Sequence, residues 1–344
     1  MTEVPVDWDS LATIHPELKA IVDVSPPEPH IADLNLPMAV MREEHDKHFI
    51  PVPGVNVVLS WDGVHKTVIK IPVSDGAEID AWLYQPESAP TGGSPLVVLY
   101  HGGGWCAGGP EMEEPLCVKA VQNFGAVALS VDYRLAPENP FPTGVTDCCD
   151  ALAWISKNAT TLKATPSRGF IIGGESTGAT GSLVSALRAR SEQNLLTHPI
   201  TGMWLAVPSV LTEEVVPEKY QAEYRSMEQC ADAPGVDRRA MKYLQDKLNP
   251  DVHDGRFNPF LWKDGHKGLP KCYFQICGLD PQRDEDLLFE RHLREEYGIE
   301  TKVDIYPGLS HAFWGFYPQM EVSRKAVGDT VKGLAWLLSR ENLR

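Results

Sequence analysis

Residues 169–178 read GFIIGGESTG, and this stretch decides the fold. Its first half is a short apolar run typical of a buried strand, and the G-x-S-x-G sequence at 174–178 opens a segment that predicts a helix. A serine on such a tight strand-to-helix turn needs neighbours without side chains, because other backbone must approach it closely. The helix behind it supplies free N–H groups and a positive dipole end. The stretch therefore predicts an α/β fold with Ser176 as a nucleophile.

Strand and helix patterns alternate on both sides of this stretch. Eight segments are expected to be strands: 66–73, 78–86, 95–101, 126–133, 169–174, 201–210, 271–278 and 301–308. The turn-like sequence SDGA between the first two predicts a hairpin, and the continuous apolar run at 95–101 is typical of a strand buried on both faces. Helices are expected at 143–158, 176–191, 283–298 and 323–341. This alternation indicates a mostly parallel, doubly wound sheet.

Two segments lie outside the alternation. The apolar residues of 7–22 recur at helical spacing, and a second helical stretch covers 38–49, so the chain begins with a helical extension. About sixty polar, helix-leaning residues separate the strands expected near 203–208 and 271–277. This interval is expected to be an insertion between two strands of the sheet.

The composition is ordinary for a soluble globular protein, with 43% hydrophobic and 23% charged residues among 344. A net charge of −16 argues against nucleic acid or an anionic membrane as a partner. We find no signal-peptide pattern and no apolar run long enough to span a bilayer. The seven cysteines form no C-x-x-C pair and are expected to be buried, reduced thiols of a cytoplasmic protein.

A second chemical motif is HGGGW at 101–105, directly after an expected buried strand. Three consecutive glycines leave backbone N–H groups unhindered, and two of these can point at a developing oxyanion. A dinucleotide or phosphate loop is the competing interpretation. The sequence has neither G-x-G-x-x-G after a first strand nor G-x-x-x-x-G-K-[ST], so we expect no nucleotide cofactor.

An acid and a base follow in the order that a serine hydrolase requires. Asp280 and Asp284 both follow the strand expected at 271–278, and Asp280 is preferred because it lies nearer the strand end. Asp284 is expected to cap or pair at the start of the next helix. His311 lies in a loop after the last strand and completes the order Ser…Asp…His. We find no metal-ligand spacing and expect neither a metal nor another cofactor.

These motifs together resemble the hormone-sensitive-lipase-like family of α/β-hydrolase esterases. The resemblance covers roughly residues 66–340 and is carried by HGGGW (101–105), DYRLAPENPFP (132–142), GESTG (174–178), NPFLWKDGHKGLP (258–270), LDPQRDE (279–285) and GLSHAF (308–313). It implies a mostly parallel sheet of about eight strands with helices on both faces and a helical cap. The implied division is 1–55 as N-terminal cap segment, 56–210 and 258–344 as the two parts of the core, and 211–257 as cap insertion.

The resemblance also assigns roles to residues. Ser176, Asp280 and His311 match the family's catalytic triad, and the backbone amides of Gly103, Gly104 and Thr177 match its oxyanion donors. A further set matches a motif that braces the strand and loop near the site, namely Tyr133, Arg134 and Glu138.

Two departures from the family pattern concern the residues around the nucleophile. Glu175 and Thr177 stand where the family usually has Asp and Ala, and Cys106 follows HGGGW, where it lines the pocket or simply packs. The bulky rings that follow the oxyanion glycines and the base are expected to crowd the substrate pocket, namely Trp105, Phe313 and Trp314. These changes affect the expected substrate range and leave the mechanism in place.

The sequence therefore predicts a serine hydrolase that cleaves esters with short or medium acyl chains, or a specialised metabolite ester, through an acyl-enzyme on Ser176. The same triad also allows an acyltransferase or a cyclisation or ring-opening enzyme. A small-molecule receptor on the hydrolase scaffold is disfavoured because Ser176, Asp280 and His311 are all present. The expected partner is a small ester, and a homodimer is left open.

Overall fold

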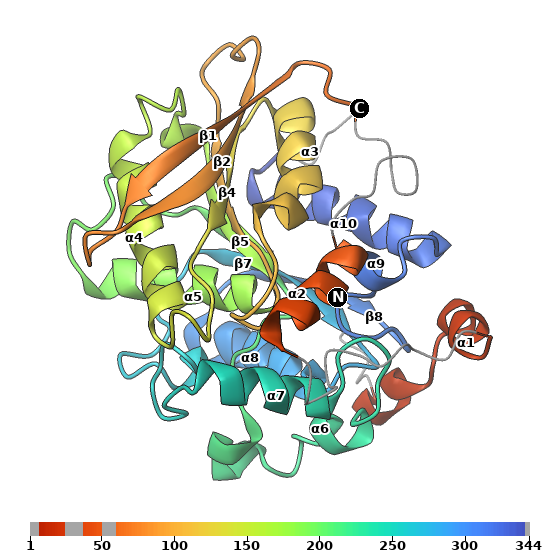
Figure 1. The fold of residues 1–344 in the computed structure, drawn as a ribbon. Helices are drawn as coiled ribbons and strands as arrows, with labels where there is room; N and C mark the ends of the chain where they lie inside the picture. The colour runs from red at the N-terminus through yellow and green to blue at the C-terminus, as the bar shows by residue number, and fades with distance from the viewer. Residues whose placement is uncertain (1–6, 25–36, 50–59, 341–344) are drawn as a thin grey trace.

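The computed structural model describes residues 7–24, 37–49 and 60–340. Its eight strands form one twisted sheet in the order β1-β2-β4-β3-β5-β6-β7-β8 (Figure 1). The strands are β1 Val64–Pro72, β2 Glu78–Pro86, β3 Leu96–Tyr100, β4 Val127–Asp132, β5 Phe170–Glu175, β6 Gly202–Ala206, β7 Lys271–Cys277 and β8 Thr301–Tyr306. β2 runs antiparallel to β1 and β4, and the other neighbouring pairs are parallel. The predicted mostly parallel sheet of about eight strands is confirmed.

Helices cover both faces of this sheet. The α-helices are α1 Pro16–Val22, α2 Met38–Phe49, α3 Glu114–Phe124, α4 Thr143–Asn158, α5 Thr177–Ser191, α6 Ser226–Gln229, α7 Arg238–Leu248, α8 Arg283–Tyr297, α9 Phe313–Phe316 and α10 Glu321–Leu337. Short 3₁₀ turns are η1 Trp8–Ala12, η2 Pro110–Glu113, η3 Pro166–Arg168, η4 Glu213–Val215, η5 Glu218–Tyr220 and η6 Pro259–Leu261. The four expected core helices are found as α4, α5, α8 and α10, whereas α3 was not predicted.

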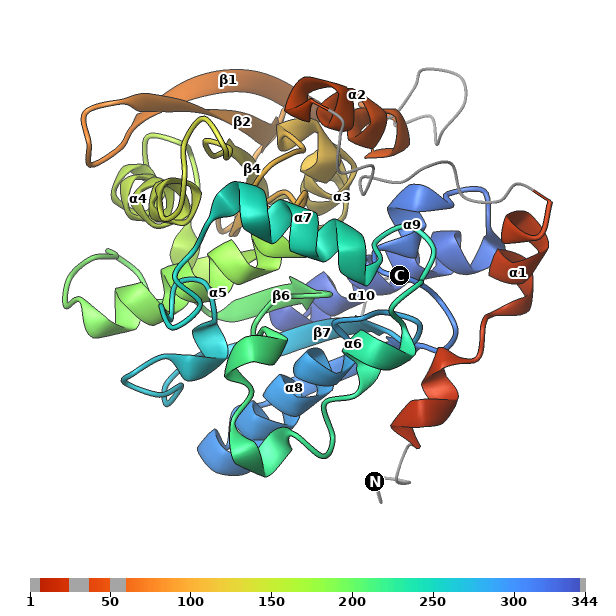
Figure 2. The ribbon, with the colours of Figure 1, turned by 60° about the horizontal axis from the view of Figure 1, so that its bottom comes forward.

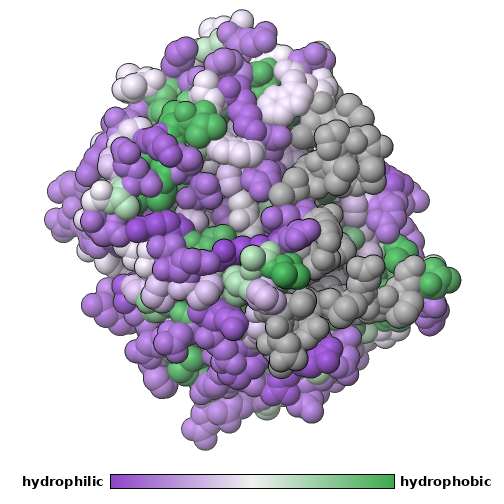
Figure 3. Space-filling model, in the orientation of Figure 1, coloured by the Kyte–Doolittle hydropathy of each residue, from purple (hydrophilic) through white to green (hydrophobic). Residues whose placement is uncertain are grey.

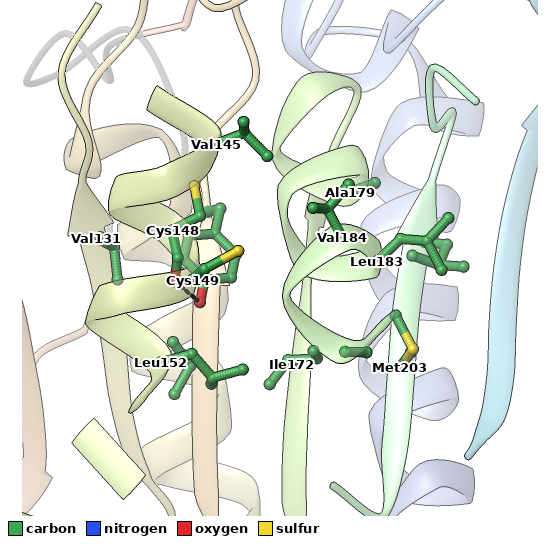
Figure 4. Close-up of a cluster of buried hydrophobic side chains, with 14 of the residues drawn as sticks. Val131, Val145, Cys148, Cys149, Leu152, Ile172, Ala179, Leu183, Val184 and Met203 are labelled. Atoms are coloured by element: carbon green, nitrogen blue, oxygen red, sulfur yellow. Dashed lines mark hydrogen bonds between the residues drawn. The ribbon is translucent and has the colours of Figure 1, made fainter. Parts of the chain in front are cut away.

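The core lies in two layers because successive strand residues point to opposite faces. Along β3, Val98 joins the layer formed with α4, α5 and α8, while Val97 and Leu99 join the layer formed with α3 and α10. Figure 4 shows part of the first layer, in which side chains of α4 (Cys148, Cys149 and Leu152) and α5 (Val184) pack over the sheet, where Ile172 lies on β5. All seven cysteines are buried and free, as predicted.

The N-terminal extension and the insertion supply helices outside this layered core. Residues 207–270, all of which the structure describes, contain helices and loops but no strand. Within them, the Asp237 side chain accepts a hydrogen bond from the Ala240 N–H at the start of α7, and Asn249 ends the helix in the left-handed conformation. α2 and α7, far apart in the sequence, lie near one another in both ribbon views (Figures 1 and 2).

The division into cap and core stays a prediction, and its boundary at 55/56 lies outside the described residues. Figure 3 shows one face of the molecule, on which hydrophilic residues predominate and apolar ones are scattered. Among the described helices, none combines the length and the apolar character needed to cross a bilayer.

Candidate active site

Ser176 occupies the tight turn between β5 and α5. Its backbone has φ 54° and ψ −123°, a left-handed conformation that is costly for any residue with a Cβ. The Ser176 N–H donates to the Ala206 carbonyl at 2.8 Å, which ties the turn to the end of β6. The hydroxyl is therefore presented at the carboxyl ends of the parallel strands, where ligands of open α/β sheets bind.

His311 and Asp280 complete a chain of hydrogen bonds to this serine. His311 Nε2 lies 3.0 Å from Ser176 Oγ, and His311 Nδ1 lies 2.8 Å from Asp280 Oδ2. The other carboxylate oxygen of Asp280 accepts from the Gln282 N–H at 2.9 Å. His311 is 4% exposed and Asp280 1% exposed, so solvent screens their interaction little. The structure brings together all three residues that the sequence nominated as catalytic.

The electrostatics of His311 suit a general base. Burial disfavours the imidazolium, but the charge and hydrogen bond of Asp280 outweigh burial, and the pKa of His311 is raised above its usual 6.5. Asp280 also fixes the proton on Nδ1, which leaves Nε2 free to accept the proton of Ser176.

We expect kcat/KM for an activated ester to fall as pH decreases through a single pKa above that of an ordinary histidine. Only neutral His311 can accept a proton, and its raised pKa places the loss of activity at a higher pH than burial alone would give. A pH–rate profile in buffers of constant ionic strength, with and without a metal chelator, measures this. An acid limb below the usual pKa of histidine, or activity lost in chelator and restored by zinc, would contradict it.

The glycine loop at 102–104, predicted to supply the oxyanion donors and called the oxyanion loop below, follows β3. Gly103 has φ 108°, and a Cβ there would come within 2.2 Å of the Ala107 carbonyl oxygen, so only glycine fits. At Gly104 a Cβ would come within 2.5 Å of Leu244 Cδ1 on α7, so the insertion lies directly against this loop. The Tyr133 hydroxyl donates to the His101 carbonyl at 2.7 Å and braces the start of the loop.

Arg42 of α2 joins the N-terminal extension to the same loop. Its guanidinium donates to the Cys106 carbonyl at 2.7 Å, to the Ala136 carbonyl at 2.8 Å and to Glu138 Oε2 at 2.6 Å. Glu138, predicted as a fold-supporting residue, thus holds α2 over the site. Arg42 could not be nominated from the sequence, because nothing local in it indicates which side chain Glu138 contacts.

A pocket opens above Ser176 between the oxyanion loop, α2 and α7. Its lining residues are Met41, His45, Gly103, Gly104, Trp105, Ala107, Met112, Glu175, Ser176, Thr177, Ser209, Thr212, Val236, Met241, Leu244, Gln245, Leu248, Phe257, Gln282, His311, Ala312 and Phe316. The four residues from α7 follow the i, i+3, i+4, i+7 spacing of one helix face. That spacing in the sequence was the signal that could have identified them.

The three aromatic residues expected at the pocket have different positions. Trp105 lines it, whereas Phe313 and Trp314 do not. Phe313 is fully buried against Tyr306. The Trp314 indole N–H donates to Glu175 Oε2. The prediction was wrong for Phe313 and Trp314. The helix α9 begins immediately after Ala312 and turns these two side chains away from the pocket. Phe316, at the end of the same helix, lines the pocket instead.

Two acids that follow Asp280 anchor the insertion. Asp284 Oδ2 accepts from the backbone N–H groups of Arg225 and Ser226, both at 2.7 Å, and Asp284 Oδ1 accepts from Arg283 Nε at 2.8 Å. Glu285 accepts from the Val210 N–H at 2.9 Å, and burial raises the pKa of Glu285 to about 8. Asp284 therefore pairs at the start of α8, as expected from the sequence.

The described residues contain no group of three or more His, Cys, Asp or Glu side chains arranged to hold a metal ion. The chemistry of the pocket is instead that of an alkoxide nucleophile, a neutral imidazole and backbone N–H donors. Such a site can form and break an acyl-enzyme.

Comparison with known proteins agrees with this geometry. A family model described as the α/β-hydrolase fold matches residues 97–315. An AB hydrolase superfamily protein of Schizosaccharomyces pombe is 34% identical over 343 residues, which are 98% of each chain. Versiconal hemiacetal acetate esterase of Dothistroma septosporum is 30% identical over 267 residues, which are 77% of this chain and 79% of that protein.

Comparison with solved structures also finds similar proteins over almost the whole chain. Vibralactone cyclase superposes with a TM-score of 0.84 at 33% identity over 97% of both chains, and a bacterial heroin esterase with a TM-score of 0.78 at 27% identity over 96% of this chain and 98% of that one. The sheet, the nucleophile turn and the matched segment define an α/β hydrolase. The chain belongs to the hormone-sensitive-lipase-like branch of the α/β-hydrolase family, which confirms the resemblance predicted from its motifs.

Proposed function

We propose that the protein is a serine carboxylic ester hydrolase that acts through an acyl-enzyme on Ser176. The observation that carries this proposal is the buried hydrogen-bonded chain from Ser176 through His311 to Asp280, at the floor of a pocket that the oxyanion glycines also line. Relatives named as esterases support the same activity.

The reaction begins when His311 accepts the proton of Ser176 and the oxygen attacks the ester carbonyl. Amides of Gly103, Gly104 and Thr177 hold the oxyanion, and removing one such donor typically costs about 3–4 kcal/mol of transition-state stabilisation. The imidazolium returns its proton to the leaving alcohol. Water then attacks the acyl-enzyme with His311 again as base, which releases the acid and restores Ser176.

The preferred substrates are esters with short or medium acyl chains. The apolar side chains of α7 face the pocket, where Met241, Leu244 and Leu248 restrict the space over Ser176. Each added methylene that still fits contributes about 0.8 kcal/mol, or about fourfold in kcat/KM, and a methylene that does not fit contributes nothing.

In a series of p-nitrophenyl esters from acetate to palmitate, we therefore expect kcat/KM to rise and then fall within the short and medium chain lengths. Labelling of the wild type by a fluorophosphonate checks in the same preparation that Ser176 is active. A maximum at about twelve carbons or more, or activation by an oil–water interface, would refute this preference. Uniformly low rates with full labelling would favour a specialised metabolite ester.

A second candidate reaction is lactone formation. The likeness to vibralactone cyclase over 97% of both chains favours it, and residues of α2 and α7 line the pocket over Ser176. In this reaction a hydroxyl of the bound acyl group, rather than water, attacks the acyl-enzyme, and its proton passes to His311.

Incubation of hydroxy-acyl esters with the enzyme, followed by mass spectrometry, separates the two outcomes. We expect the hydroxy acid as the main product, one water heavier than the lactone. Lactone as the main product would identify the protein as a cyclising enzyme.

We also propose a small ester as ligand, a cytoplasmic location and no nucleic-acid partner. Seven free, buried cysteines and a net charge of −16 support these points. Sedimentation of the full chain, at the mass of one or two copies, tests the homodimer.

A further inference from the structure

Two strained turns meet at the active site. Ser176 has φ 54° in the nucleophile turn, and Ala312, directly after the base, has φ 47°. Both carry a Cβ, and such residues keep a left-handed conformation only where surrounding contacts determine it. The bond between His311 and Ser176 joins the turns, but it must break and re-form in every catalytic cycle. The two turns therefore need a second contact, one that persists through the whole cycle and keeps the distance between them constant.

Glu175 and Trp314 supply such a contact. Glu175 directly precedes Ser176 and Trp314 follows His311 by three residues, and the Trp314 indole N–H donates a hydrogen bond to Glu175 Oε2. Glu175 is 9% exposed, so this bond is shielded from competing water.

Both partners are held in place by their surroundings. The indole of Trp314 packs edge-on against Tyr306 of β8, with ring centroids 6.1 Å apart, and against Phe313 at 5.1 Å. Phe313 is itself fully buried, so α9 is fixed against the end of the sheet. Glu175 is the last residue of β5, where the sheet restrains its backbone.

The length of the Glu175 side chain matters for this contact. Position 175 carries a glutamate, whose side chain is one methylene longer than that of an aspartate. Because an aspartate carboxylate would lie about 1.5 Å closer to the backbone, it would withdraw from the indole N–H.

We propose that Glu175 and Trp314 are positioning residues, whose hydrogen bond holds the nucleophile turn and the base loop at the spacing that proton transfer between Ser176 and His311 requires. This inference rests on the proposed hydrolase function. It gives Glu175 and Trp314 roles in kcat rather than in substrate binding.

The link also affects titration of the base. The acids that act on His311 are Asp280 of the loop after β7, Glu175 of β5 and Glu285 of α8, and each favours the imidazolium. Glu175 itself faces His311 and the buried Glu113 of η2. Burial raises the pKa of Glu175 to about 6, and the Trp314 hydrogen bond opposes that rise. Loss of the Trp314 donor therefore makes Glu175 easier to protonate, which lowers the pKa of His311 in turn.

Three variants separate the hydrogen bond from the charge. Trp314→Phe removes the donor and keeps a smaller aromatic ring against Tyr306 and Phe313. Glu175→Asp keeps the charge and shortens the reach, whereas Glu175→Gln removes the charge and keeps an oxygen that can accept from Trp314. Trp61→Phe is the matched control, because Trp61 is 41% exposed and lies outside the pocket lining.

At a pH above the acid limb, we expect Trp314→Phe and Glu175→Asp each to lower kcat for p-nitrophenyl acetate by about ten- to a hundredfold, the effect of a small misplacement of catalytic groups. KM should change less than kcat, although Glu175 lines the pocket, because the expected loss lies in proton transfer between Ser176 and His311. Glu175→Gln keeps an acceptor for the Trp314 N–H, so its kcat should fall by less than that of Glu175→Asp. The acid limb of kcat/KM should move to lower pH in Glu175→Gln and in Trp314→Phe.

The proposal is wrong if Trp314→Phe and Glu175→Asp keep wild-type kcat, or if Glu175→Gln loses as much kcat as Glu175→Asp. Near-ultraviolet circular dichroism verifies the fold, and Glu175→Asp carries the test alone if Trp314→Phe does not fold. Failure of the hydrolase function itself looks different, because the wild type and the Trp61→Phe control would then also lack esterase activity.

Discussion

Ser176→Ala is expected to lower kcat for an activated ester by about 10⁴–10⁶-fold. Ser176 Oγ is the atom that attacks the carbonyl, and the nearest atom of the base, His311 Nε2, lies 3.0 Å from it. Alanine leaves the oxyanion amides and pocket in place, so only the residual catalysis of binding and charge stabilisation should remain. Initial rates with p-nitrophenyl acetate, in enzyme purified away from host esterases, measure the loss.

The fold should survive this substitution. Alanine has the same Cβ as serine, so it meets the same backbone strain at φ 54° and adds none. Ser191→Ala at the exposed end of the same helix is the control, and it should retain full activity and fluorophosphonate labelling. Near-normal turnover by a folded Ser176→Ala protein would rule out the acyl-enzyme mechanism.

The layered core follows from patterns that are local in the sequence. The eight expected strands all occur: β1 and β2 are the predicted hairpin, and β3 is a buried parallel strand with the continuous apolar run expected of one. The helix α3 was overlooked, although Leu116, Val118 and Val121 are among its buried residues. Strand order beyond the first hairpin could not be predicted, since it depends on contacts between segments far apart in the chain.

The candidate site also has some residues that local sequence patterns predict and others that depend on contacts between distant segments. Ser176, Asp280 and His311 could be nominated because each follows a strand, and the carboxyl ends of parallel strands meet at one edge of the sheet. The pocket as a whole could not be predicted, because the spacing of Met241 and its neighbours gives a helix face but not its place in the fold, and Met41 reaches the pocket from a helix that the sheet pattern does not position. The position of the Trp314 ring depends on the residue at which α9 begins. It also depends on a hydrogen-bond acceptor, Glu175, that lies 139 residues away in the sequence.

Asp280, in the loop before α8, and Asp284, in the first turn of α8, are both buried carboxylates, and their replacement by asparagine should have very different effects. In Asp280→Asn, the oxygen that accepts from the Gln282 N–H stays an oxygen, so the new amide group faces His311 Nδ1. An amide there donates instead of accepting, which places the imidazole proton on Nε2 and removes the acceptor that Ser176 needs. We expect kcat to fall by about 10⁴-fold without loss of the fold.

Asp284→Asn should affect stability more than chemistry. The oxygen that accepts from the Arg225 and Ser226 N–H groups can be kept, but the amide then faces Arg283 Nε, a donor, at the position of the lost oxygen. Arg283 and Asp284 form a fully buried ion pair, so loss of the carboxylate charge leaves the guanidinium uncompensated, at a cost of about 3–5 kcal/mol. The thermal midpoint should therefore fall, while kcat stays within about tenfold of wild type because His311 and Ser176 keep their partners. Thermal unfolding and kcat, measured on both variants side by side, show which of the two acids orients His311. An Asp284→Asn protein that is folded yet as inactive as Asp280→Asn would assign that role to Asp284 and not to Asp280.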